Sequence, residues 1–284
     1  MRPLALWGIF AALIIGNAAV FFLVLTPHPK ELRVSVLDIG QGDSILLEGP
    51  TGIQMLVDGG PGRVVLGPLT REMPFFDRSL DMVVETHPDK DHVGGLPSVF
   101  DRYRVSYFME PGIPNDTDAA NAVIEAGRNE PGIVHVLARR GMRIALGGGA
   151  YADVLYPDRD PSKLETNNGS IVLHVVYGAT SFMLTGDLPS ENEDWLIALD
   201  GEDGELKSDV LKAGHHGSHY STDNAWLAAV HPAMVAISAG KDNSYGHPAP
   251  DTIARIQNEG AEIYSTIQSG TLHFVSDGKT VREK

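Results

Sequence analysis

The 284-residue chain contains no cysteine, which excludes disulfide bonds and every thiolate metal site. Any bound metal ion must therefore be held by histidine, aspartate, glutamate or backbone oxygen. Basic residues are also scarce, because 22 lysines and arginines face 37 aspartates and glutamates, for a formal net charge of −15. Tight, sequence-independent attraction to nucleic-acid phosphates normally needs a basic protein, so the composition disfavours that role.

A local scarcity of charge marks the N-terminus, since residues 4–25 contain no charged side chain. At about 1.5 Å per helical residue this run is long enough to cross a hydrocarbon layer of about 30 Å. It ends at Pro27 without a small-residue cleavage signal. The sequence therefore predicts an uncleaved transmembrane anchor over about residues 4–25, within an anchor and spacer of residues 1–31. The short N-terminus favours an extracytoplasmic location for the rest of this membrane-anchored chain.

From residue 32 onward, short runs rich in valine, isoleucine and leucine alternate with glycine, proline, aspartate and asparagine. These runs predict strands at 32–37, 45–47, 55–57, 82–84, 133–137, 154–156, 171–177, 182–184, 210–211, 234–237, 263–265 and 272–275. Helices are expected over 118–128, 190–199, 223–230 and 250–259. Ser190 and Glu193 have the spacing of a capping box at the start of one of them. Strands with helices between them predict a layered α/β domain over residues 32–284.

Side chains that can bind a cation follow directly after several of these strands. They are Asp38, Asp58, Glu85 to His87, Asp187, and His215 with His216. In layered α/β proteins, ligand sites gather beyond the carboxyl ends of strands, where loops meet at a rigid edge. A single aspartate after a strand is usually a turn residue, but the repetition of the pattern favours a shared site.

The densest group of ligand-type residues is His87-Pro88-Asp89-Lys90-Asp91-His92. In an extended segment His87, Asp89 and Asp91 share one face, while His92 diverges from Asp91 and is available to a second ion. A solvated polar loop is the alternative, and it is less favoured for so dense a run. If Asp89, Asp91 and Asp187 converge, the pKa of at least one carboxyl group must rise unless a cation is bound. Mixed imidazole and carboxylate ligands suit Zn²⁺ or Mn²⁺.

Taken together, the motifs of the chain resemble the metallo-β-lactamase superfamily, and specifically the hydrolase domain of ComEC-type DNA-uptake competence proteins. The matching pieces are Asp38-Ile39-Gly40-Gln41-Gly42-Asp43-Ser44, Asp58-Gly59-Gly60, residues 86–96, Asn167-Asn168 with Ser170, Thr185-Gly186-Asp187, residues 211–218 and Tyr245-Gly246-His247-Pro248. They occur in the order of the family and span residues 32 to about 275. The resemblance implies an αββα metallo-β-lactamase-like sandwich with a metal site at one edge of the paired sheets.

The resemblance also implies roles for individual residues. The implied metal ligands are His87, Asp89, Asp91, His92, Asp187 and His216, with His215 as the other candidate for the last position. The implied catalytic residues are Asp91, His215 and His247, and the substrate contacts are His215, Ser218 and His247. Asp38, Asp43, Ser44 and Asp58 are expected to orient the ligands. Two divalent ions, Zn²⁺ or Mn²⁺, are the expected cofactors.

Two departures from the family pattern stand out. The broader superfamily has histidine at the position of Asp89, although the competence branch shares the aspartate. It also has a ligand histidine near residues 167–170, where this chain has none, and His174 lies within an apolar strand. Competence proteins of this type usually carry a large membrane channel as well, so a chain with one predicted span resembles the hydrolase module alone.

The leading functional hypothesis is a metal-dependent hydrolase that cleaves phosphodiesters, with DNA as the first candidate substrate. A local basic strip for DNA would draw on Arg102, Arg104, Arg139, Arg140 and Arg143. The alternatives are a cell-envelope phosphoester such as a phosphocholine or teichoic-acid link, a non-catalytic binding module of a competence complex and, more distantly, a β-lactam. No protein partner follows from the sequence.

Overall fold

The computed structural model describes residues 3–25, 30–200 and 204–284, and the chain divides into two compact units, residues 1–30 and 31–284. The first unit holds helix α1 (Pro3–Leu25). Across the described residues, no helix is both long and apolar enough to span a bilayer. This finding contradicts the predicted span over residues 4–25, and with it the membrane anchoring and the extracytoplasmic location.

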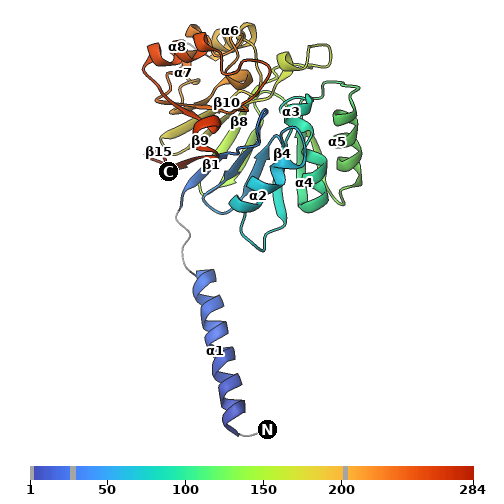
Figure 1. Ribbon diagram of the computed structural model, residues 1–284, viewed down its shortest axis with the longest axis vertical. Helices are drawn as coiled ribbons and strands as arrows, with labels where there is room; N and C mark the ends of the chain where they lie inside the picture. Colours follow the sequence, from blue (N-terminus) through green and yellow to red (C-terminus); the bar gives the residue numbers. More distant parts are fainter. Residues whose placement is uncertain (1–2, 26–29, 201–203) are drawn as a thin grey trace. The chain divides into compact units, whose positions relative to one another are not determined.

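The second unit is a sandwich of two sheets with helices on its outer faces (Figure 1). Over the described residues the larger sheet has eight strands, in the order β15 (Val281–Glu283), β14 (Leu272–Ser276), β1 (Leu32–Val36), β2 (Ile45–Glu48), β3 (Gln54–Val57), β4 (Ser79–Val84), β5 (Arg104–Glu110) and β6 (Val134–Leu137). The other sheet has seven, in the order β13 (Glu262–Ser265), β12 (Met234–Ile237), β11 (Val210–Lys212), β10 (Thr180–Leu184), β9 (Val172–Tyr177), β8 (Ala150–Tyr156) and β7 (Arg143–Gly147).

Over the described residues, the α-helices come in equal number from the two halves of the second unit. The first half contributes α2 (Leu66–Glu72), α3 (Lys90–Val93), α4 (Leu96–Arg102) and α5 (Asp118–Asn129), and the second contributes α6 (Ser190–Asp200), α7 (Asn224–Val230), α8 (Pro250–Glu259) and α9 (Thr266–Ser269). One apolar core lies between the sheets, around Leu47, Leu173 and Phe274. Two further cores pack helices against the outer faces, around Phe108 and Trp226 respectively. The predicted αββα sandwich of two sheets is therefore confirmed.

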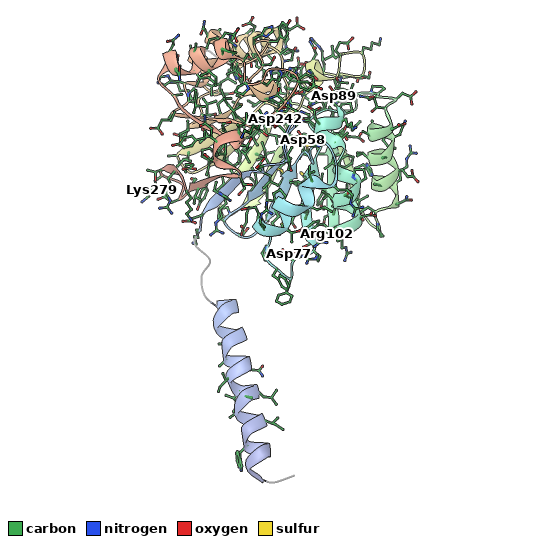
Figure 2. The ribbon with its side chains drawn as sticks, viewed as in Figure 1. Asp58, Asp77, Asp89, Arg102, Asp242 and Lys279 are labelled. Atoms are coloured by element: carbon green, nitrogen blue, oxygen red, sulfur yellow. The ribbon has the colours of Figure 1, made fainter. Side chains whose placement is uncertain are left out.

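The direction of the strands decides where the polar loops meet. Strands β3, β4, β5 and β6 run parallel to one another in one sheet, and β10, β11, β12 and β13 run parallel to one another in the other. Because parallel strands end at the same edge, the loops that follow them gather there. Figure 2 shows Asp58 and Asp89, which follow β3 and β4, at one end of the unit, with Asp77, which precedes β4, at the opposite end.

Candidate metal centre

The loop after β4 supplies two of the histidines of the site. The chain stays extended through Asp89, with φ −78° and ψ 145°, and then turns into α3 at Lys90. Asp91 and His92 therefore lie on a helical turn and do not continue the extended segment expected from the sequence. His87 and His92 are both fully buried, and their ring centroids lie 4.1 Å apart.

Asp187, which follows β10, lies at the centre of the cluster and is 3% exposed. Its Oδ1 is 3.2 Å from Nε2 of His92. Its Oδ2 is 3.9 Å from Nε2 of His87, 3.6 Å from Nε2 of His215 and 3.5 Å from Nε2 of His216. One carboxylate from the second sheet thus faces imidazoles from both halves of the chain.

The loop after β11 presents its two histidines differently. His215 and His216 both have left-handed backbone, with φ 46° and 56°, a conformation that costs on the order of 1–3 kcal/mol for a residue other than glycine. His216 is 1% exposed and its Nε2 lies 3.3 Å from Oδ2 of Asp91, whereas the side chain of His215 is 29% exposed. The strained loop therefore places His216 among the buried ligand-type groups and His215 at their rim.

Polar groups on the far side of two of the buried rings, those of His92 and His216, fix the orientation of these rings. Oδ2 of Asp58 lies 2.8 Å from Nδ1 of His92, and the carboxylate also accepts hydrogen bonds from the backbone N–H and the hydroxyl of Thr86, at 2.8 and 2.7 Å. Nδ1 of His216 lies 3.1 Å from the backbone carbonyl of Ser238 and 3.3 Å from Oδ1 of Asp43, and Asp43 forms a buried ion pair with Lys212. Such partners hold a ligand ring in place and raise its basicity.

Several other residues singled out from the sequence have different surroundings. Ser44 donates from its hydroxyl to the backbone carbonyl of Asp58, at 3.0 Å, and so supports the loop that holds His92. Asp38 is exposed, and its Oδ1 accepts from the N–H of Gly40 at 3.4 Å, which makes it a turn residue. Oγ of Ser218 likewise accepts from the backbone N–H of Tyr220 at 3.3 Å.

The segment where the broader family has a further ligand histidine carries Ser170 in this chain. Its hydroxyl accepts from the backbone N–H of Asp187 at 3.3 Å, so this position supports the central aspartate. His174 is half-buried in β9, opposite Met183 of β10, with its Nε2 buried. Burial lowers the pKa of His174, as expected for a neutral histidine in the sheet.

The charges of the cluster are strongly coupled. Burial opposes ionisation of Asp187, but His216, His92 and His87 hold its pKa well below the usual range. Burial favours the neutral form of His216, but Asp187 and Asp43 raise its pKa to about 9. For His92, Asp187 and Asp58 outweigh burial in the same way and raise the pKa well above normal. Burial and the neighbouring His92 lower the pKa of His87 to about 3.

The donor set fits a divalent cation. Nε2 of His87, His92 and His216 and Oδ1 of Asp187 are all buried, and none of them makes a hydrogen bond of good geometry. Polar atoms buried in this way are costly unless a partner satisfies them, and a cation among them satisfies all four. Asp43, His92, Asp187 and His216 also form a group whose ligand atoms lie within 4.8 Å of one another. Since Asp43 faces Nδ1 of His216, we place it behind that ring.

A cavity of about 130 Å³ opens onto the cluster. Its lining consists of Gln41, Asp89, Asp91, Asp187, His215, His216, Tyr245 and His247. Gln41 and Tyr245 were not expected there, although both lie within motifs that the family resemblance covers. Thr86 and Lys212 were also missed, because an ordinary threonine or lysine next to a strand carries no signal until its partner is known.

Comparisons with known proteins agree with this geometry. The family model of the metallo-beta-lactamase superfamily matches residues 37–237. ComE operon protein 3 of Bacillus subtilis is 30% identical over 272 residues, which cover 89% of this chain and 34% of the relative. Competence protein ComA of Neisseria gonorrhoeae is 32% identical over 251 residues, covering 86% of this chain and 32% of the relative.

The chain thus spans about a third of the length of these relatives. Among solved structures, Tm1679, described as a metal-dependent hydrolase of the beta-lactamase superfamily, shares the fold with a TM-score of 0.51. The two sequences are 15% identical, and the match covers 82% of this chain and 95% of that one. The sandwich, the site at its edge and the match over most of the second unit lead to one conclusion: the chain belongs to the metallo-beta-lactamase superfamily.

Proposed function

We propose that this protein is a metal-dependent phosphodiesterase that acts on DNA. The observation that carries the proposal is the buried group of imidazole nitrogens around Asp187, open to a cavity on one side. DNA is supported by the relatives, one of which is named a competence protein and is 32% identical to this chain. The cavity has three aspartates in its lining, so a bound cation is also needed to offset their repulsion of a phosphate.

In this mechanism the residues grouped around Asp187 hold the metal, and His215 and His247 hold the substrate. His87, His92, His216, Asp89, Asp91 and Asp187 are the proposed ligands. A divalent ion there supplies Lewis acidity, lowers the pKa of bound water from about 16 to about 7 and offsets negative charge on the phosphate. Asp58 and Asp43 keep the rings of His92 and His216 aimed at the cluster.

His215 and His247 lie at the rim, with ring centroids 5.5 Å apart. Burial lowers the pKa of both, and for His247 the neighbouring His215 adds to this effect. Both rings are therefore neutral at pH 7, and each has one N–H to donate. We assign them to donating hydrogen bonds to a phosphate oxygen and to the leaving-group oxygen.

The test combines metal analysis with a substrate panel. Purified protein should contain divalent metal and hydrolyse single-stranded DNA and aryl phosphodiesters, with little action on phosphocholine esters or β-lactams. Asp187→Asn should abolish turnover and metal content, because it removes the central carboxylate. Asp81→Asn is the matched control, since Asp81 lies at the far end of β4, where its Oδ2 accepts from the backbone N–H of Gln54. Metal-loaded protein that cleaves no phosphodiester would refute the proposal.

A second variant tests the role of the rim. His247→Ala should reduce turnover of an aryl phosphodiester about 10²-fold while metal content stays normal, because the ring binds substrate and not metal. His231→Ala is the control, since His231 is 73% exposed and pairs with Glu259 on the surface. Unchanged turnover in the His247 variant would remove this residue from the mechanism.

A further inference from the structure

Tyr245 stands out among the residues of the cavity because its ring is uncharged, flat and 69% exposed. The remainder of the lining consists of carboxylates, imidazoles and the amide of Gln41. The Tyr245 ring is stacked on the ring of His247, with centroids 5.8 Å apart and planes 13° from parallel. One face of the tyrosine is thus supported by a residue of the proposed substrate site.

The loop that carries Tyr245 is held by a single side chain. Nδ2 of Asn243 donates to the backbone carbonyls of Gly240 and His247, at 2.7 and 2.6 Å. Oδ1 of the same amide accepts from the N–H groups of Tyr245 and His247, at 3.1 and 3.0 Å. All four bonds fix the loop before any ligand arrives, so a ligand that stacks on the ring loses little affinity to ordering of the loop.

The chemistry of an exposed, supported aromatic ring beside a phosphate site favours a nucleobase as the group that rests on it. Stacking on an aromatic side chain tolerates every base, because every base has a π face. A choline group would also be attracted to an aromatic ring, but its recognition normally uses a cage of several rings. In the described lining of this cavity, Tyr245 is the only phenylalanine, tyrosine or tryptophan, so a planar base fits better than a quaternary ammonium group.

We propose that Tyr245 is a specificity-determining residue that stacks on the base next to the scissile phosphate and so selects nucleic-acid phosphodiesters. This inference rests on the proposed function, since it takes the cavity to bind a phosphodiester. Tyr245 acts on substrate binding and not on the chemical step. Its removal should therefore raise KM for base-bearing substrates and leave kcat unchanged.

The experiment uses the metal-loaded full chain with two labelled substrates of equal length, a decathymidylate and an abasic oligonucleotide with the same sugar–phosphate backbone. Tyr245→Ala should raise KM for the decathymidylate about tenfold and leave KM for the abasic substrate unchanged. Tyr245→Phe should behave as the unmodified protein. Phe76→Ala is the matched control, since Phe76 is 91% exposed and adjoins Asp77 at the opposite end of the unit from Asp89 (Figure 2).

Equilibrium binding of a hydrolysis-resistant phosphorothioate decathymidylate separates this inference from the proposed function. If the protein cleaves both substrates and Tyr245→Ala changes neither KM nor binding, stacking is refuted while the phosphodiesterase stands. If the protein cleaves nothing but Tyr245→Ala weakens binding about tenfold, stacking stands and the proposed activity fails. A KM increase confined to p-nitrophenylphosphocholine would overturn the inference in favour of a cationic group, and absence of both binding and cleavage would refute both proposals.

Discussion

At the scale of single residues, Asp58 shows how the site depends on groups that do not face the metal. Its Oδ2 lies 2.8 Å from Nδ1 of His92, on the side of the ring opposite to Asp187. Its backbone has φ 60°, which asparagine also tolerates. Asp58→Asn should therefore keep the fold but remove the negative charge that orients and polarises the ring. We expect a 10–100-fold loss of metal affinity, measured by competition with a chelating dye.

The control for this variant is again Asp81→Asn, which removes a carboxylate of the same sheet away from the cluster. Its metal affinity should equal that of the unmodified protein. If Asp58→Asn also binds metal with unchanged affinity, the orienting role of Asp58 is wrong and His92 is held by packing alone.

Protons and metal compete for the same imidazoles. In the metal-free protein the pKa of His216 is raised to about 9 and that of His92 lies well above normal, with burial opposing and Asp187 causing both shifts. At pH 7 both rings therefore carry protons that a metal ion must displace. Metal affinity should increase with pH up to about 9 and decrease as pH falls, by as much as tenfold per pH unit for each proton released.

Calorimetric titration with metal in two buffers of different ionisation enthalpy measures the protons released. The expected number at pH 7 lies between one and two, and it should fall by about one as pH rises through about 9, where His216 loses its proton. Affinity that stays constant between pH 6 and 9 would contradict the raised pKa values of the two histidines.

Sequence patterns predict the candidate metal-ligating residues more readily than the residues that orient them. The run from His87 to His92 is dense enough to indicate a metal loop by itself, and the family resemblance adds Asp187 and His216. Lys212 shows the limit, because its buried ion pair with Asp43 joins residues far apart in the chain. Likewise, Asp38 follows a strand as Asp58 does, but Asp38 is exposed whereas Asp58 is buried.

At the scale of elements, runs of apolar residues predict the buried strands well but miss strands that carry many exposed residues. Every strand expected from an apolar run is present, from β1 to β14. β5, β7 and the short β15 were missed, because each carries exposed residues, such as Tyr107 of β5 at 46% exposure, and β5 and β7 begin with arginine. These strands lie at or next to a sheet edge, where one face has little to pack against and the apolar signal is weak.

Helix α6 illustrates a local rule overruled by tertiary contacts. Ser190 and Glu193 have capping-box spacing, but the N–H of Ser190 donates to the carbonyl of Tyr220 instead. The carboxylate of Glu193 accepts from the N–H groups of Thr222 and Asp223, at 2.7 and 3.3 Å, ahead of α7. The hydroxyl of Thr222 in turn accepts from the N–H of Gly214, so Glu193 supports the loop that carries the histidines.

The buried carboxyl group of Glu193 makes the unfolding free energy depend on pH. Burial raises the pKa of Glu193 from 4.5 to about 8. Because the folded state then holds the proton more tightly than the unfolded state, the stabilisation from this proton is complete below about pH 4.5 and is lost as pH rises to about 8. Glu193→Gln cannot titrate, so its unfolding free energy should fall less steeply than that of the unmodified protein, by on the order of 1 kcal/mol per pH unit.

Urea unfolding between pH 5 and 8 measures the difference. Glu191→Gln is the control, because Glu191 is exposed on the same helix. Parallel stability curves for Glu193→Gln and the unmodified protein would show that this carboxyl is already ionised in the folded state.

At the scale of the whole molecule, the negative charge decides how DNA can be held. Most of the arginines expected to form a basic strip either pair with carboxylates or lie away from the cavity. Arg140 forms an ion pair with the buried Asp200, and Arg143 forms one with Asp153 at 2.6 Å. Arg102 lies at the same end of the unit as Asp77, opposite to Asp89 (Figure 2). The net charge of −15 is therefore not relieved by a basic surface at the site.

Binding of single-stranded DNA should accordingly depend on metal and stacking and only weakly on salt. Each phosphate neutralised by lysine or arginine contributes about −0.7 to the slope of log K against log salt concentration. Since no lysine or arginine is among the described residues that line the cavity, we expect a slope between 0 and about −2. Fluorescence anisotropy with the phosphorothioate decathymidylate, from 50 to 500 mM KCl, measures the slope, and chelation of the metal should abolish binding. A slope steeper than about −4, or binding that persists without metal, would place the DNA on a basic surface away from the cavity and would contradict a site built from a metal cluster and an aromatic rim.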